Sequence, residues 1–211
     1  MTPRILPRGI YAVTDPGLTP NEQLPVAVAA AARGGARIVQ YRSKRGDPAT
    51  RLREAAMLRS VCTQAGAVFI VNDDVALAAA VGADGVHLGR DDPEPGAVRA
   101  RMGDELIIGV SCYADPAAAR AAVAAGADYV AFGSVFPSPI KPDAVRAPLE
   151  LLGLGPELGV PVVAIGGINE DNIASVAAAG AHAAAVISGV FAGGEPEGAA
   201  RRLSKAFAGA R

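Results

Sequence analysis

Two cations and an amide stand together near residue 40, in a pattern that suits an anion. The segment Gln40-Tyr41-Arg42-Ser43-Lys44 ends a run of mainly apolar residues. Side chains alternate along an extended chain, so Gln40, Arg42 and Lys44 can share one face. Arginine grips a phosphate through two parallel donors, and lysine adds a second positive charge. The spacing predicts an anion site, with a solvated strand end as the alternative.

Two short acidic segments suggest a divalent cation beside that anion. Asn72-Asp73-Asp74 and Arg90-Asp91-Asp92 each follow an apolar run. If the two runs are neighbouring strands, Asp73 and Asp92 can reach the same ion. Magnesium commonly takes one or two carboxylates and completes its shell with water and phosphate oxygens. We therefore expect Asp73 and Asp92 to be metal ligands. The remaining two aspartates are expected to cap helices or lie on the surface: Asp74 and Asp91.

Glycine-rich turns follow the last two apolar runs and suit a second anion. Gly166-Gly167 ends one run, and Ile187-Ser188-Gly189 ends the other. Glycine lets a phosphate approach backbone N–H groups closely, and in barrel enzymes these late loops often hold one. The alternative is that the glycines only form turns. Together with the segment at 40–44, the pattern indicates one substrate with a diphosphate and another with a monophosphate.

The other reactive side chains form no nucleophile–base arrangement, so covalent catalysis is not expected. His87 and His182 lie within apolar runs and are expected to be buried structural residues. Cys62 and Cys112 lack metal-ligand spacing, and we expect free thiols in a reducing cytoplasm. Cys112 follows Ser111 at the end of an apolar run, where it can line the pocket that holds the substrates.

A fourfold repeat indicates the elements that position these residues. Segments 34–41, 81–89, 125–133 and 179–188 each contain glycine, alanine, a polar residue and a short apolar run. Glycine tolerates the left-handed backbone found at helix C-termini. The apolar run, without polar alternation, is typical of a strand covered on both faces. Each repeat is therefore interpreted as a helix end that turns into a buried strand.

Strands and helices alternate along the whole chain, which predicts an α/β fold and a single TIM (βα)8 barrel. An open doubly wound sheet is the structural alternative. Helical stretches include 115–125 and 170–179, with Asn169 as the expected cap of the second. The proline-rich segment 134–148 is expected to be a lid or binding loop. The expected strands span 9–14, 36–42, 67–72, 84–88, 106–111, 128–133, 160–166 and 183–188.

The composition fits one catalytic domain over residues 1–211. Apolar residues make up 51% and charged residues 19%, enough for a sizeable core. Lys and Arg number 20 against 21 Asp and Glu, so a nucleic-acid partner bound through a basic face is not expected. We find no run of about 18 apolar residues and no signal peptide. The expectation is a cytoplasmic enzyme without a membrane span.

Taken together and in order, the motifs resemble those of the thiamine phosphate synthase family, from about residue 9 to residue 191. The resemblance implies a TIM-barrel transferase of thiamine biosynthesis that requires Mg2+. It would join 4-amino-2-methyl-5-hydroxymethylpyrimidine diphosphate to 4-methyl-5-(2-phosphoethyl)thiazole and release pyrophosphate. The family mechanism is dissociative: pyrophosphate leaves first, and the thiazole nitrogen captures the pyrimidine carbocation. The motifs are VQYRSK (39–44), VNDDVALAAAVGADGVHLGRDD (71–92), IGVS (108–111), GADYVAFGSVFPSPIK (126–141), VVAIGGIN (162–169) and VIS (186–188).

The resemblance also implies roles for individual residues. Asp73 and Asp92 would bind magnesium, and the charge of the leaving diphosphate would be neutralised by Arg42, Lys44 and Lys141. The pyrimidine diphosphate would lie against Gln40, Tyr41, Arg42, Ser43, Lys44, Asn72, Ser111 and Lys141. The thiazole phosphate would lie against Ser138, Ile140, Gly166, Gly167, Ile187 and Ser188.

Several positions depart from the family pattern. Ser138 and Ile140 stand where a threonine pair is usual, and Gly133-Ser134 replaces glycine-proline. Arg90 replaces a glutamine, and Tyr113 replaces a histidine two residues after the serine at the end of the fifth strand. The isoleucine side chain cannot hydrogen-bond to a phosphate, so the departures bear mainly on thiazole-phosphate contacts in the loop 134–141.

Three other functions fit parts of the pattern. A sister thiazole tautomerase shares the barrel but needs neither the diphosphate cations nor magnesium, so the segment 40–44, both aspartates and Lys141 favour the synthase. A non-catalytic phosphate-binding barrel would not explain two metal carboxylates. A phosphosugar isomerase would need a general base, and no strand-end glutamate or histidine supplies one. The oligomeric state stays open, with a homo-oligomer as one alternative.

Overall fold

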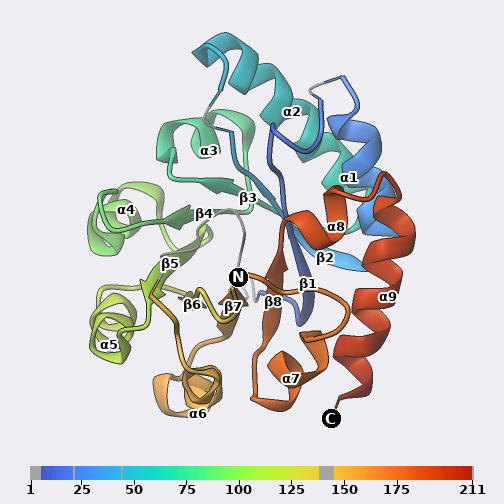
Figure 1. The fold of residues 1–211 in the computed structure, drawn as a ribbon. Helices are drawn as coiled ribbons and strands as arrows, with labels where there is room; N and C mark the ends of the chain where they lie inside the picture. The colour runs from blue at the N-terminus through green and yellow to red at the C-terminus, as the bar shows by residue number, and fades with distance from the viewer. Residues whose placement is uncertain (1–5, 21, 44, 138–144, 211) are drawn as a thin grey trace.

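Eight parallel strands close into a barrel, which Figure 1 shows end-on with the helices around it. This computed structural model describes residues 6–20, 22–43, 45–137 and 145–210. Each strand pairs with the next, and β8 pairs with β1, so the predicted TIM barrel is confirmed and an open sheet is excluded. The strands are β1 (Gly9–Val13), β2 (Ala36–Tyr41), β3 (Val68–Asn72), β4 (Gly85–Leu88), β5 (Ile107–Tyr113), β6 (Tyr129–Gly133), β7 (Val162–Ile165) and β8 (Ala183–Val186).

Side chains of each strand alternate between the barrel interior and the helical layer, as in strands covered on both faces. In β2, Val39 and Tyr41 belong to the large apolar cluster under the helices, whereas Ile38 packs inside the barrel. Gln40 has the parity of Ile38 and is buried. The inner cluster consists of Leu6, Tyr11, Val13, Ile38, Ile70, Ile107, Tyr129, Ala131, Val163, Ala183 and Ala185.

The helices surround the barrel and begin or end at the expected signals. Asp74 caps α3, because its carboxylate accepts a hydrogen bond from the Leu77 N–H at 2.9 Å. Gly82 ends the same helix with a φ of 61°, the left-handed region predicted for the repeat glycines. The helices are α1 (Leu24–Arg33), α2 (Pro48–Ala65), α3 (Val75–Val81), α4 (Pro95–Met102), α5 (Pro116–Ala124), the 3-10 helix η1 (Leu149–Leu154), α6 (Gly155–Leu158), α7 (Ile173–Ala178), α8 (Ser188–Phe191) and α9 (Pro196–Gly209).

Four predicted boundaries differ by two residues or more. β5 ends at Tyr113 instead of 111, and β7 begins at Val162 instead of 160. The helix expected over 170–179 begins at Ile173, because the Asn169 side chain accepts hydrogen bonds from the N–H groups of Asp171 and Asn172 at 2.9 and 3.2 Å. Asn169 therefore closes a turn before the helix instead of capping it. The strand expected over 183–188 ends at Val186, and Ser188 already opens α8.

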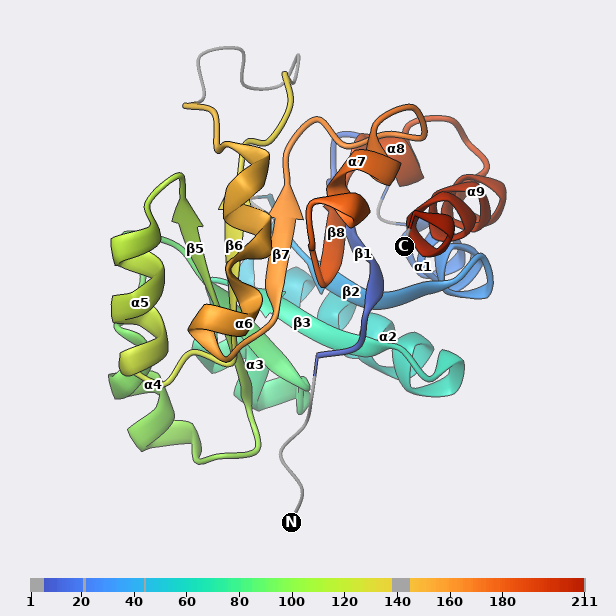
Figure 2. The ribbon, with the colours of Figure 1, turned by 90° about the horizontal axis from the view of Figure 1, so that it is seen from below.

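All eight strands run parallel, so their carboxyl ends meet at one end of the barrel. Figure 2 shows the arrowheads of β5 and β7 at this end, and Figure 1 faces it. The predicted polar segments follow the strands and therefore belong to this end. None of the helices in the described ranges has the length and apolar character needed to cross a membrane.

Candidate active site

Polar side chains from four consecutive strands line the inside of the barrel near its carboxyl end. Gln40 in β2 and His87 in β4 are buried, while Asn72 in β3 and Ser111 in β5 are half-buried. Their positions share the inward parity of the strands. The expectation that Gln40, Asn72 and Ser111 come from one end of the barrel is therefore confirmed, although contact with a substrate stays a prediction.

A chain of hydrogen bonds connects Gln40 to Ser111 across the interior. Gln40 Nε2 donates to Tyr11 Oη at 2.8 Å, and Tyr11 Oη lies 2.9 Å from Tyr129 Oη. Tyr129 Oη lies 2.9 Å from His87 Nδ1, and His87 Nε2 lies 2.8 Å from Ser111 Oγ. The sequence analysis missed both tyrosines. The alternation of side chains in the strands expected at 9–14 and 128–133 could have placed both tyrosines on the inner face of the barrel.

His87 is buried within β4, as predicted, whereas His182 is only half-buried and lies just before β8. Burial lowers the pKa of His87 to about 4, and the negative charge of Asp92 offsets part of that effect. The His87 ring therefore stays neutral at physiological pH, with both nitrogens hydrogen-bonded. His182 immediately precedes β8, and its Nε2 donates to the Leu6 carbonyl at 2.8 Å, at the opposite end of the barrel.

Asp73 and Asp92 form a close carboxyl pair. Burial, a hydrogen bond with Asp92 and the Asp92 charge together raise the pKa of Asp73 to about 6, while Arg42 and Asn72 act in the opposite direction. The backbone holds both residues: the Asp73 N–H donates to the His87 carbonyl at 2.8 Å, and Asp92 Oδ2 accepts from the Gly89 N–H at 2.7 Å. The two carboxylates therefore lie close enough to interact, while their role as metal ligands stays a prediction.

This carboxyl pair suits a divalent cation. Two carboxylates that repel each other, with the Asn72 amide beside them, match the few protein oxygens that magnesium takes when phosphate and water complete its shell. Within the described ranges no group of three or more His, Cys, Asp or Glu side chains could hold a metal. Asp91 is exposed, as expected.

Arg42 is held next to the carboxyl pair by its backbone. Its N–H donates to Thr14 Oγ1 at 2.9 Å, and the same hydroxyl donates to the Arg42 carbonyl at 3.3 Å. The positive charge of Arg42 lowers the pKa of Asp73, which places the guanidinium within electrostatic reach of that carboxyl. Lys44 lies outside the described residues.

Tyr41 and Ser43 lie apart from this group. Tyr41 points into the layer between β2 and α2, where its hydroxyl donates to Glu54 Oε2 at 2.6 Å. Its side chain is thus on the opposite face of β2 from Gln40, because neighbouring strand residues point in opposite directions. Ser43 Oγ donates to the Arg45 carbonyl at 3.0 Å. The structure brings neither side chain together with the interior polar group.

The glycines after β7 allow two loops to pack tightly. Gly166 and Gly167 have φ values of 103° and 66°. A Cβ at Gly166 would overlap Ser134, and one at Gly167 would overlap the Pro137 carbonyl. The loop after β6 therefore lies directly on the loop after β7, which is the close approach for which glycine is needed. Ile187 packs against the inner cluster and Ser188 is exposed at the start of α8.

The described ends of the loop 134–148 meet beside these glycines. The Ser134 carbonyl accepts from the Ala147 N–H at 3.0 Å, and Ser134 Oγ donates to the Phe136 carbonyl at 2.7 Å. Figure 2 shows the chain after β6 extending beyond the strand ends. The predicted contacts of Ser138, Ile140 and Lys141 lie outside the described residues.

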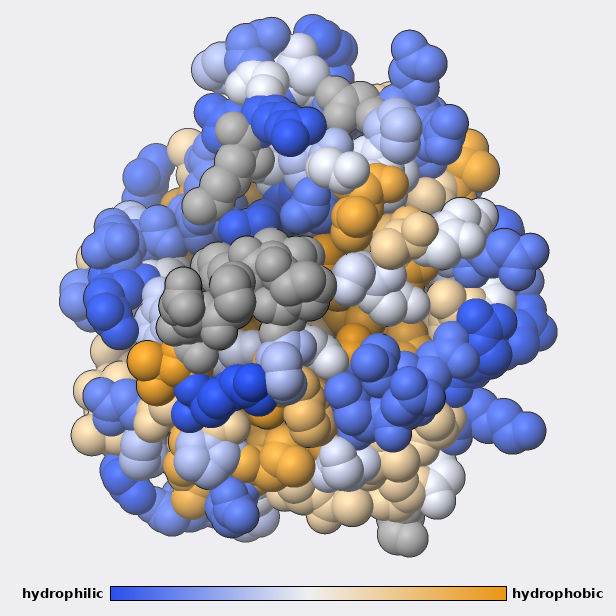
Figure 3. All heavy atoms as spheres, in the orientation of Figure 1, coloured by the Kyte–Doolittle hydropathy of each residue, from blue (hydrophilic) through white to orange (hydrophobic). Residues whose placement is uncertain are grey.

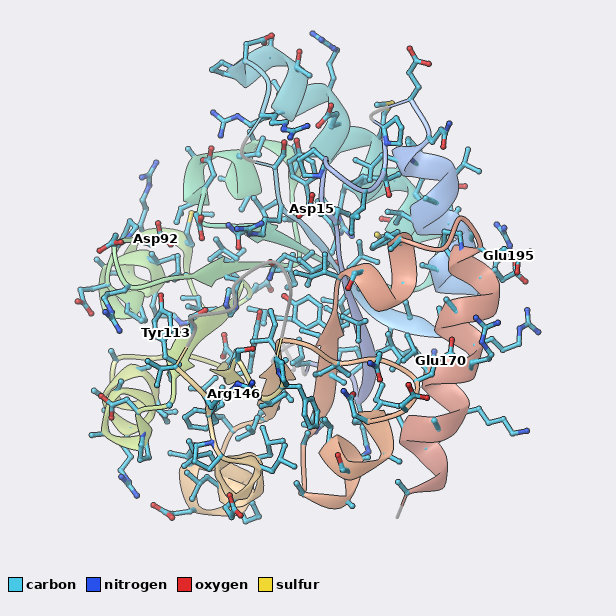
Figure 4. The ribbon with its side chains drawn as sticks, in the orientation of Figure 1. Asp15, Asp92, Tyr113, Arg146, Glu170 and Glu195 are labelled. Carbon is cyan, nitrogen blue, oxygen red and sulfur yellow. The ribbon has the colours of Figure 1, made fainter. Side chains whose placement is uncertain are left out.

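Two residues that depart from the family pattern contact each other. The Arg90 guanidinium lies 4.6 Å from the centroid of the Tyr113 ring, in a cation–π contact between the segments that follow β4 and end β5. Figure 4 shows Tyr113 and Asp92 on neighbouring segments at this edge of the barrel. The paired change is therefore one local feature of the rim rather than two separate ones.

A groove of about 750 Å³ lies elsewhere, between α1 and the segment 191–201 on the outside of the barrel. Its lining includes Glu22, Val26 and Arg201 and none of the predicted site residues. Figure 3 shows hydrophilic residues around the periphery of the face at the carboxyl end of the barrel, where the chemistry is predicted.

A closed (βα)8 barrel with a carboxyl pair and an arginine at the carboxyl ends of its strands defines a TIM-barrel enzyme. The particular family follows from comparison with known proteins. The chain belongs to the thiamine monophosphate synthase family, whose profile matches residues 10–190. The activity of this family is a transferase reaction.

Individual relatives agree with this assignment. The thiamine-phosphate synthase of Halorhodospira halophila is 58% identical over 196 residues, covering 92% of each chain. That of Chromobacterium violaceum is 53% identical over the full length of both chains. Among solved structures, a thiamine phosphate pyrophosphorylase from Pyrococcus furiosus superposes with a TM-score of 0.87 at 36% identity, covering 96% of each chain.

Proposed function

We propose that the chain condenses 4-amino-2-methyl-5-hydroxymethylpyrimidine diphosphate with 4-methyl-5-(2-phosphoethyl)thiazole, giving thiamine phosphate and pyrophosphate. The observation that carries this proposal is the Asp73–Asp92 carboxyl pair beside Arg42, in a barrel of this family. Carboxylates beside an arginine suit a diphosphate only when a divalent cation lies between them. The whole chain acts as one domain in this proposal, because β1 and β8 close the barrel together.

The proposed mechanism is dissociative. Breaking the bond to the diphosphate places negative charge on the leaving group, and Arg42 offsets that charge, together with Lys44 and Lys141. Magnesium, bound by Asp73 and Asp92, would supply further neutralisation of the diphosphate. The side chains near the reacting atoms hold and orient the pyrimidine, and none has to act as a nucleophile. This agrees with the neutral, fully hydrogen-bonded state of His87.

The two substrates would bind to different parts of the site. Gln40, Asn72 and Ser111 would contact the pyrimidine diphosphate from inside the barrel. The thiazole phosphate would lie at Gly166 and Gly167, with Ser188 at the start of α8, where backbone N–H groups are available. The buried free thiols Cys62 and Cys112 suit a reducing compartment, and we propose a cytoplasmic location.

The first test is pyrophosphate release by purified protein given both substrates, with magnesium and then with EDTA. We expect release only with both substrates and magnesium, accompanied by thiamine phosphate. The matched variants are Asp92→Asn and Asp91→Asn, two neighbouring carboxylates of which only Asp92 contacts Asp73. Asp92→Asn should lower turnover by at least ~100-fold, and Asp91→Asn should leave it unchanged.

Two outcomes would contradict the proposal. Tautomerisation of a thiazole phosphate without pyrophosphate release would indicate the sister enzyme. Binding of phosphorylated ligands with no turnover of either kind would indicate a binding protein. Equal losses in the two aspartate variants would leave the synthase but remove the metal assignment from Asp92.

A further inference from the structure

Five side chains inside the barrel form one continuous chain of four hydrogen bonds. In order they are Gln40, Tyr11, Tyr129, His87 and Ser111, with donor–acceptor distances between 2.8 and 2.9 Å. They come from five different strands, and the first four are buried with relative exposures of 9% or less. Gln40 and Ser111, at the two ends of the chain, are the residues placed above against the pyrimidine.

The middle of the chain depends on a glycine. His87, Gly109 and Tyr129 lie side by side on β4, β5 and β6 in the strand register. A Cβ at Gly109 would overlap the Tyr129 ring, so the ring crosses β5 only because residue 109 has no side chain. The ring then stacks on His87, with centroids 5.6 Å apart and planes 26° apart. The glycine at position 109 thus leaves the space that the Tyr129 ring occupies.

The direction of the chain follows from the donors available. The Gln40 amide nitrogen can only donate, so Tyr11 Oη accepts from it and uses its own proton toward Tyr129. Tyr129 then donates to His87 Nδ1, which leaves the imidazole hydrogen on Nε2, directed at Ser111 Oγ. In this order each of the four hydrogen bonds has one donor hydrogen and one acceptor. Toward the rest of the pocket, Gln40 still offers its carbonyl oxygen and its second amide hydrogen, and the Ser111 hydroxyl, which accepts from His87, offers its hydrogen as a donor.

We propose that this interior chain sets the hydrogen-bonding polarity of the pyrimidine subsite, with His87, Tyr129 and Tyr11 as positioning residues. An acceptor at Gln40 and a donor at Ser111 match an aminopyrimidine edge, where an amino group stands next to a bare ring nitrogen. The donor at Ser111 opposes the edge of the corresponding oxo-pyrimidine, where the ring nitrogen carries a hydrogen, whereas the Gln40 amide can face either edge. The chain therefore makes the site select the amino form. This inference rests on the proposed function for the identity of the ligand, but not for the hydrogen-bond order.

The hydrogen-bond order can be measured without activity. The polypeptide contains only two histidines, so the imidazole nitrogens of 15N-labelled protein give few signals. A His182→Gln variant shows which signals belong to His182 and which to His87. We expect His87 to be the neutral tautomer with hydrogen on Nε2. Removing the Tyr129 hydroxyl with Tyr129→Phe should shift His87 toward the tautomer with hydrogen on Nδ1, because Nδ1 loses its donor. The Nδ1–H tautomer in the unaltered protein would overturn the proposal.

Selectivity is measured with the aminopyrimidine diphosphate and its oxo counterpart, by calorimetric binding and by turnover. The unaltered protein should prefer the amino form by at least ~100-fold, and Tyr129→Phe should reduce that preference by at least ~10-fold. The affinity for the thiazole phosphate should not change. Val163→Ala is the control, since it removes buried volume from the same interior without touching the chain.

The outcomes separate this inference from the proposed function. If Tyr129→Phe keeps the full preference, or if Val163→Ala loses it equally, the positioning role is wrong. If the unaltered protein turns over neither pyrimidine with the thiazole phosphate, the proposed function fails. The tautomer and the binding preference then still decide whether the chain sets the polarity of the subsite.

Discussion

At the scale of single residues, the environment of Asp73 has the clearest physical consequence. Its carboxyl lies beside Asp92, and burial together with that neighbour raises its pKa to about 6. In the unfolded chain the pKa of an aspartate is about 4. Between these values the folded protein binds the proton more tightly, so folding stability falls as pH rises from about 4 to about 6. At neutral pH the ionised pair therefore costs stability when no cation is present.

Replacement of this carboxyl should stabilise the metal-free protein. We expect Asp73→Asn to raise the melting temperature by about 2 °C at pH 7.5, a modest effect because the residue is exposed and solvent screens its charge. The difference should vanish below about pH 3, where the aspartate is protonated in both states. Thermal unfolding monitored by circular dichroism in EDTA measures it. Added magnesium should raise the melting temperature of the unaltered protein alone. An equal response of the variant to magnesium would contradict the carboxyl pair as the metal site.

At the scale of elements, the loops after β6 and β7 act as one unit. Backbone hydrogen bonds at 3.0 Å continue from Val135 to Ile165 and from Phe136 to Gly166, beyond the ends of the two strands. The tight approach is possible because Gly167 has neither a side chain nor a restriction to negative φ. The proposed thiazole-phosphate contacts therefore depend on how two loops fit together.

A methyl group at this junction should separate the two substrates. Gly167→Ala should weaken the affinity for the thiazole phosphate by at least ~10-fold, because the methyl would displace the Pro137 carbonyl. The affinity for the pyrimidine diphosphate should change much less. Steady-state kinetics with each substrate varied in turn measures both.

The matched control is Gly82→Ala. The φ of Gly82 is 61°, close to the 66° of Gly167, but a methyl group at position 82 would meet no other atom within 4 Å. The Gly82→Ala variant therefore reports the effect of backbone strain alone. If the two variants have the same kinetics, the loop junction is not part of the thiazole-phosphate site.

At the scale of the whole molecule, closure of the barrel buries groups that are reactive when exposed. Cys62 lies on the buried face of α2 and Cys112 near the end of β5, and each is less than 2% exposed. Burial raises the pKa of both thiols to about 12. The thiolate is the reactive form, so both cysteines should be inert in the folded protein.

This protection makes alkylation a probe of global unfolding. At pH 8, iodoacetamide should label neither cysteine of the native protein over a period in which it labels both in guanidinium chloride, as counted by mass spectrometry. Rapid native labelling of Cys112 alone would show that the carboxyl end of the barrel opens locally. Rapid labelling of Cys62 would contradict the packing of α2 on the barrel.

Local sequence was enough to place most elements of this fold. Four repeated helix ends, each followed by an apolar run, together with the alternation of apolar and helical stretches in the rest of the chain, predicted all eight strands, because burial on both faces leaves a signal within the strand itself. The polar residues at the ends of those runs predicted the meeting of Asp73 and Asp92, since parallel strands bring their carboxyl ends together. The boundaries near Asn169 and Ser188 were less accurate, because turns closed by side chains compete with helix and strand locally.

The hydrogen-bond chain and the Arg90–Tyr113 contact required the tertiary structure. Tyr11 and Tyr129 are 118 positions apart, and each reads locally as an ordinary strand residue. Whether their hydroxyls meet depends on the curvature and stagger of the closed barrel, and on the missing side chain at Gly109. Tyr113 likewise faces Arg90 only because the end of β5 departs from regular pairing, with a φ of 54° at Tyr113. Local periodicity tells which face a residue occupies, whereas distances across the barrel are decided only when all eight strands close.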